Sequence, residues 1–96
     1  MIKEKIVDIL IRELKFSEHV ANLTADDLLK IHKKLQPALQ LWLDTRTITD
    51  FELLGFSIKQ LMEKRQYSFP SALISMDWLM TEPEIAKNEL INEIRR

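Results

Sequence analysis

The amino-acid sequence predicts an all-α fold: a compact single domain, residues 1–96, with about five helices and one short helix. Apolar residues recur at helical spacing along most of the chain. One glycine and three prolines in 96 residues leave few interruptions, which favours helices over a turn-rich β fold. A chain of this length typically builds one core. We expect irregular packing, orthogonal or bundle-like, because the expected helices differ in length.

Two helices are expected in the first half of the chain. In residues 2–15 the apolar side chains occupy one broad face, with Val7 and Ile11 at its edge. A second helix is expected over residues 25–44, capped by Thr24. Its apolar stripe keeps its phase across Pro37, so we predict one long helix; two shorter helices meeting at the proline are the alternative. This arrangement leaves His19 in a loop and His32 in the apolar stripe.

Capping patterns predict the helix starts of the second half, because a Ser or Thr followed three residues later by Glu or Gln satisfies free backbone N–H groups. A short helix is expected from Thr49 to a stop at Gly55. A helix of about ten residues is expected after Ser57. The next should begin at Ser68, with Pro70 in its first turn, and continue to Met80. A last helix is expected after Thr81.

Composition excludes several chemistries. Fourteen basic and fifteen acidic residues give a net charge of −1, unlike the strongly basic balance of most nucleic-acid binders. One glycine excludes a P-loop and a dinucleotide fingerprint, and no cysteine is present to bind zinc or act as a nucleophile. His19 and His32 lie in no metal-binding motif. We therefore expect no enzymatic activity, no cofactor and no metal. No apolar run approaches a membrane span. The cysteine-free chain and its charged N-terminus predict a cytoplasmic protein.

The helix that begins after Ser68 is apolar on two sides. Such a helix is either central in its domain or packed on a partner. In the first case Trp78 belongs to the core, and in the second Ile74 and Trp78 form an interface anchor. The main apolar face comprises Phe69, Ala72, Leu73, Met76, Leu79 and Met80, and the opposite face holds the protein-interaction candidates Ile74, Trp78, Ser71 and Asp77.

Residues 57–79 resemble a helix-turn-helix, with Gln66 where the turn usually has glycine. The second helix would read bases through its exposed residues, with Phe69, Ser71, Ile74 and Ser75 as candidates. However, no lysine or arginine occurs from Gln66 to Ala86, and DNA affinity depends largely on neutralising phosphates. Weak anion-binding candidates lie elsewhere, on the polar face of the expected helix 25–44: Lys30, Lys33 and Lys34.

The sequence thus favours a small non-enzymatic protein-binding or regulatory protein of the accessory, immunity, antitoxin or adaptor type, which acts through an apolar helix face. A protein partner or self-association is expected, and neither a membrane nor a small-molecule substrate is indicated. The alternative is a helix-turn-helix transcription regulator, in which a dimer could bring the three lysines onto DNA.

Overall fold

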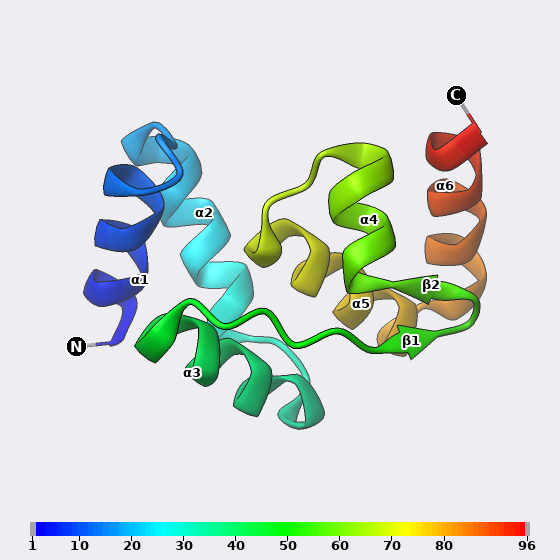
Figure 1. Ribbon diagram of the computed structural model, residues 1–96, viewed down its shortest axis with the longest axis horizontal. Helices are drawn as coiled ribbons and strands as arrows, with labels where there is room; N and C mark the ends of the chain where they lie inside the picture. The colour runs from blue at the N-terminus through cyan, green and yellow to red at the C-terminus, as the bar shows by residue number, and fades with distance from the viewer. Residues whose placement is uncertain (1, 96) are drawn as a thin grey trace. The chain divides into compact units, whose positions relative to one another are not determined.

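The computed structural model describes residues 2–95 and confirms the all-α fold class (Figure 1). Within these residues the chain forms six α-helices, one 3₁₀ turn and two strands of two residues each. It divides into two compact units, residues 1–47 and 48–96, called here the N-terminal and C-terminal units. The single-domain organisation stays a prediction.

The N-terminal unit begins with two helices that run side by side, α1 (Ile2–Arg12) and α2 (Glu18–Leu29). Helix α1 ends earlier than predicted, because Lys15 adopts a left-handed conformation (φ +61°) and the Phe16 N–H donates to the Leu10 carbonyl at 3.1 Å. A residue in the left-handed conformation just beyond the last turn is a common way for a helix to end. Helix α2 begins where the Ser17 hydroxyl accepts a hydrogen bond from the Val20 N–H at 3.2 Å.

The predicted helix over residues 25–44 is wrong. Helix α2 begins seven residues earlier, at Glu18, so His19 is helical, and it ends at Leu29. The 3₁₀ turn η1 (Lys33–Leu35) and helix α3 (Gln36–Thr45) follow. Two shorter helices are therefore present, as in the alternative, but the break lies before η1.

Proline explains why the break lies upstream. Pro37 lies in the first turn of α3, where its missing N–H is harmless. Further inside a helix its ring would clash with the carbonyl four residues earlier, so one straight helix through Pro37 is disfavoured. His32 begins η1, since its Nδ1 accepts a hydrogen bond from the Lys34 N–H at 3.1 Å. This histidine is exposed, so its predicted place in the apolar stripe is wrong.

The core of the N-terminal unit combines large side chains of α1, α2 and α3 with two alanines of α2. Ala21 and Ala25 are fully buried, and their size permits close approach of α1 and α2. An ion pair joins the end of α1 to the end of α3: Arg46 Nε lies 2.8 Å from Glu13 Oε1. The larger buried side chains are Ile6, Ile9, Leu10, Leu28, Ile31, Leu35, Leu39, Trp42 and Leu43.

The C-terminal unit begins with a small hairpin, so the short helix predicted from Thr49 to Gly55 is wrong. Strands β1 (Glu52–Leu53) and β2 (Phe56–Ser57) pair antiparallel, with Leu53 opposite Phe56. Leu54 and Gly55 connect them with φ of +53° and +87°. A two-residue loop with both φ values positive fits a type I′ turn. Gly55 does supply a positive φ, but it does so in a hairpin and not at a helix end.

Two predicted helix starts are confirmed. Helix α4 (Ile58–Arg65) has a complete capping box: the Ser57 hydroxyl accepts the Gln60 N–H at 3.1 Å, and the Gln60 side-chain oxygen accepts the Ser57 N–H at 3.3 Å. Helix α5 (Phe69–Thr81) begins after Ser68, whose hydroxyl accepts the Ser71 N–H at 3.3 Å. Both caps use side chains within three residues of the groups that they satisfy.

The last predicted start is displaced. Thr81 is the final residue of α5, and its hydroxyl donates to the carbonyls of Asp77 and Trp78, at 3.2 and 3.3 Å. Helix α6 begins two residues later and spans Pro83–Arg95. Thr81 therefore bonds back to the preceding helix and does not cap the following one.

Candidate interaction surfaces

Helix α5, which carries the predicted interaction residues, has no exposed residue from Phe69 to Met80. Its main apolar face is buried except at Met80, which is half-buried, and α5 packs against α4 and α6. On the opposite face Ile74 and Trp78 are half-buried, and so are Ser71 and Asp77. The hydroxyl of Ser71 lies 3.1 Å from that of Ser68, within the capped first turn. This face therefore leaves only part of each candidate accessible.

Helices α4 and α5 pack together and are joined by three residues, 66–68, a connection as short as that of a helix-turn-helix. Gln66 ends α4 in a left-handed conformation (φ +57°), the backbone geometry for which glycine is usual, and its N–H bonds to the Leu61 carbonyl. Phe69 is 2% exposed, so its side chain cannot reach a base, and its prediction as a base-contacting residue is wrong. Ser71, Ile74 and Ser75 stay half-exposed. The turn therefore has a short connection and a left-handed residue, but the second helix of the motif carries no positive charge.

The lysines predicted as an anion site do not share one helical face. Lys30 follows the end of α2, and Lys33 and Lys34 belong to η1. All three are exposed. Their side chains surround no buried polar group in the described residues, and exposed lysines on a surface turn are ordinarily solvated.

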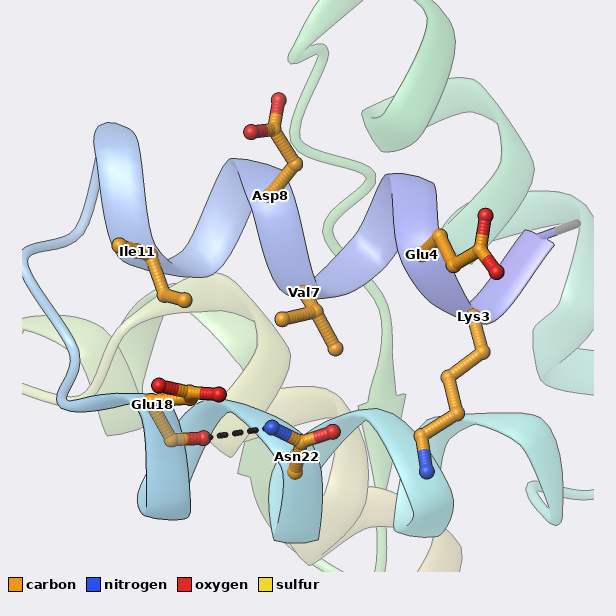
Figure 2. A pocket seen from close by; sticks show the side chains of 7 residues that line it. All are labelled: Lys3, Glu4, Val7, Asp8, Ile11, Glu18 and Asn22. Atoms are coloured by element: carbon orange, nitrogen blue, oxygen red, sulfur yellow. Dashed lines mark hydrogen bonds between the residues drawn. The ribbon is translucent and has the colours of Figure 1, made fainter.

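A groove between α1 and α2 was not predicted from the sequence (Figure 2). Val7 is half-buried and points from α1 toward α2, and Ile11, 36% exposed, lies near the start of α2. Polar and charged side chains complete the two walls. The groove, called here the α1–α2 groove, is lined by Lys3, Glu4, Val7, Asp8, Ile11, Glu18 and Asn22.

The charges around this groove are unevenly compensated. Lys3 Nζ lies 2.9 Å from Asp26 Oδ1, so this lysine is neutralised by a carboxylate of α2. Asp8 points away from α2 in Figure 2 and pairs with Arg12 at 3.1 Å. Glu18 forms no ion pair within residues 2–95. The lining contains one lysine and three carboxylates, so its balance is acidic.

A second hollow lies where residues of α1, α2 and α3 meet. Ile2 and Leu29 are 49% and 40% exposed at its edge, above the buried side chains of Leu28 and Leu39. The hollow, called here the α3-side hollow, is lined by Ile2, Leu28, Leu29, Gln36, Leu39 and Gln40. These two hollows of the N-terminal unit are together called here the strip, and six of the thirteen residues that line them are apolar.

Part of this strip is indicated by the sequence. Val7 and Ile11 fall at the edge of the apolar face of α1, beyond the width that a core alone requires. The groove itself needs α2 as its second wall. Because the start of α2 was missed, Glu18 and Asn22 were not expected to lie on a helix at all.

The described residues contain no group of three or more histidine, aspartate or glutamate side chains arranged to hold a metal ion. No helix among them is both long and apolar enough to cross a membrane. Comparisons with protein-family models, with curated proteins and with solved structures found no match for this chain.

Proposed function

We propose that this protein is a small non-enzymatic protein of the accessory, adaptor, immunity or antitoxin type, which works by binding another protein. The observation that carries the proposal is the strip formed by the α1–α2 groove and the α3-side hollow. Three of its apolar side chains, Ile2, Ile11 and Leu29, are exposed by 36% to 49%. Single exposed apolar residues are ordinary, but apolar side chains gathered in concave surface mark binding sites.

Burial of this strip would supply the driving force for association. Removing apolar surface from water stabilises a complex by roughly 25 cal/mol per Å². The carboxylates and amides around the strip provide a polar rim of the kind that gives an interface its orientation. An apolar helix surface therefore remains the basis of the function expected from the sequence, on α1 and α2 in addition to α5.

Affinity capture from the organism that makes the chain tests this proposal. We expect a partner that is retained by the unmodified protein and lost with Ile11→Lys or Leu29→Lys, because a lysine at either position replaces an apolar side chain of the strip with a charge. Ile85→Lys is the matched control, since Ile85 is 56% exposed on α6. All three variants should melt at the temperature of the parent protein. Equal capture by the parent and the strip variants would contradict the proposal.

DNA binding is the second candidate, favoured by the backbone geometry of α4, the turn at Gln66, and α5. We expect negligible binding of duplex DNA at physiological salt, because α5 contributes no positive charge. Tight, salt-sensitive binding that is lost when Lys30, Lys33 and Lys34 are replaced by alanine would reverse the order of the two candidates.

A further inference from the structure

We infer that the α3-side hollow binds an acidic segment of the partner protein, which inserts one apolar side chain between the hollow's walls. This inference rests on the proposed function and adds to it the chemistry of the partner segment. Three observations carry it: the small size of the hollow, the lysines in the segment that joins α2 to α3, and the pairing of the carboxylates around the hollow. The lysines are Lys30, Lys33 and Lys34.

The α3-side hollow has room for one apolar side chain. Its volume is about 160 Å³, close to that of an engineered cavity of about 150 Å³ that binds a single benzene molecule. Pockets that enclose a whole small-molecule ligand typically measure roughly 300–1,000 Å³. Leu28 and Leu39 are 1% and 6% exposed beneath the hollow, and Ile2 and Leu29 form the apolar part of its edge. A leucine, isoleucine or phenylalanine side chain therefore matches the hollow in size and polarity.

Two of the lysines border the hollow because of their places in the backbone. Lys30 directly follows Leu29 at the end of α2. Lys33 lies one 3₁₀ turn before Gln36, whose N–H donates to the Lys33 carbonyl, and side chains three residues apart in such a turn lie on the same side. Gln40 follows Gln36 by four residues, one turn of α3. Lys33 therefore continues the row of Gln36 and Gln40, which both line the hollow.

The three lysines carry charge that a ligand can meet. All of them are exposed, and none forms an ion pair within the part of the chain that the structure describes. A solvated lysine alone contributes little to binding. Next to an apolar hollow, however, the same charges can orient a segment whose apolar side chain supplies the driving force.

The carboxylates beside the hollow on α2 and α3 are paired with lysines of α1. Asp26 Oδ1 lies 2.9 Å from Lys3 Nζ. Asp44 Oδ1 accepts a hydrogen bond from the Gln40 side chain at 2.9 Å and lies 3.4 Å from Lys5 Nζ. These two carboxylates therefore do not offset the charge of the three lysines.

Two further carboxylates of this region point away from the hollow. Glu4 lies two residues after Ile2 on α1, and Asp27 lies two residues before Leu29 on α2. Residues two apart are about 200° apart around a helix, and Glu4 lines the α1–α2 groove instead. The charge at the edge of the hollow is therefore basic. Aspartate or glutamate on either side of the inserted side chain would be attracted, and lysine or arginine would be repelled.

The hollow favours a peptide over nucleic acid as the ligand of these lysines. A DNA duplex presents phosphates to the lysines, but it has no aliphatic side chain to fill an apolar hollow. An acidic peptide with one large apolar residue satisfies both features at once.

Selection from a displayed peptide library tests the inference. The peptides have about nine residues, roughly 30 Å when extended, with leucine, isoleucine or phenylalanine at the centre and random residues elsewhere. They are sorted on the full-length protein and counter-sorted on a variant with Ile2→Gln and Leu29→Gln, which changes the apolar edge without a change of charge. We expect the hollow-dependent peptides to carry more aspartate and glutamate than lysine and arginine. Hollow-dependent peptides with neutral or basic flanks would overturn the inference and leave the proposed function standing.

A matched pair of triple variants tests the lysines directly. Fluorescence anisotropy of a selected peptide should show about three- to thirty-fold weaker binding and a smaller salt dependence when Lys30, Lys33 and Lys34 are replaced by glutamine, as expected for three solvent-exposed charge pairs. The control replaces three exposed lysines of the C-terminal unit by glutamine and should leave the affinity nearly unchanged; these are Lys59, Lys64 and Lys87. Equal effects of both triple variants would overturn the inference.

Duplex DNA and a second copy of the chain are the other occupants to be tested. Random duplex that binds more tightly than the selected peptides, and is lost in the variant of the three lysines, would overturn the inference in favour of nucleic acid. A dimer in sedimentation that the Ile2→Gln, Leu29→Gln variant abolishes would also overturn it. If no peptide distinguishes that variant from the parent, the hollow is not a peptide site and the inference is wrong. Capture of a partner that depends on Ile11 would still support the proposed function.

Discussion

At the scale of the residue, Trp78 separates the two interpretations of the second face of α5. It is half-buried, in a helix whose residues are otherwise buried or half-buried up to Met80. Because part of its surface is already in water, we expect Trp78→Ala to lower the free energy of unfolding by about 1–3 kcal/mol, less than the 3–5 kcal/mol typical of a fully buried tryptophan. Urea unfolding measures this change.

Two further variants serve as references for the stability change of Trp78→Ala. Met76→Ala, at a fully buried position of the same helix, should cost about 2–5 kcal/mol, and Ile85→Ala on the exposed face of α6 should change stability by less than about 0.5 kcal/mol. If Trp78→Ala leaves stability unchanged while it abolishes partner binding or self-association, Trp78 is an interface anchor and not part of the core.

Glu13 makes the stability of the N-terminal unit depend on pH. The hydrogen bond from Arg46 lowers the pKa of this carboxyl below its ordinary value, an effect that desolvation partly opposes. Because its pKa is lower in the folded state than in the unfolded state, the pair stabilises the fold above the unfolded-state pKa. That contribution is lost as the pH falls through the folded-state pKa. We expect Glu13→Gln to have a lower urea midpoint than the parent at pH 7 and the same midpoint well below pH 4, where both carry a neutral side chain. A difference that persists unchanged at acid pH would contradict the ion-pair explanation.

At the scale of the element, the hairpin turn depends on two positive φ angles. Leu54 adopts φ +53°, which is unfavourable for a residue with a Cβ and is best tolerated by glycine or asparagine. We expect Leu54→Asn to stabilise the protein by about 0.5–1 kcal/mol. Gly55→Ala should destabilise it by about 1–2 kcal/mol, through backbone strain alone, since a Cβ there would contact nothing within 4 Å. Thermal unfolding of both variants tests the turn, and equal melting temperatures would argue against a type I′ geometry.

The helix caps can be ranked by the stability that each one contributes. Ser57→Ala and Ser68→Ala should each cost about 0.5–2 kcal/mol, because each removes the acceptor for a backbone N–H at a helix start. Thr81→Ala should cost less than about 0.5 kcal/mol, because its hydroxyl bonds to carbonyls of a helix that is already formed. If Thr81→Ala lowers stability as much as the two serine substitutions do, Thr81 acts as the cap of the last helix.

At the scale of the whole molecule, the single-domain prediction can be tested with the two tryptophans. Trp42 belongs to the N-terminal unit and Trp78 to the C-terminal unit. Each unit has fewer than 50 residues, a size at which a separate core is marginal. We therefore expect the single-tryptophan variants Trp42→Phe and Trp78→Phe to report transitions that each coincide with the variant's own far-UV circular dichroism transition in urea. In either variant, fluorescence that changes apart from the circular dichroism would show that the units unfold separately.

The sequence by itself determined the features that depend on neighbours along the chain. The all-α class follows from apolar spacing and the scarcity of glycine. The starts of α4 and α5 follow from Ser57 and Ser68, whose hydroxyls satisfy N–H groups three residues away. In each case the chemical partners lie within one helical turn, so the pattern of residues is sufficient.

Tertiary structure decided the features whose partners are distant or whose local signals are ambiguous. A glycine with positive φ serves a helix end or a hairpin equally well, and pairing of Leu53 with Phe56 selected the hairpin. The bidentate pair of Glu13 and Arg46 joins residues 33 positions apart. The α1–α2 groove likewise exists because Glu18 and Asn22 come to lie beside Val7 and Ile11. Spacing along a chain describes one helix face at a time, whereas a binding groove is a relation between two faces that only packing establishes.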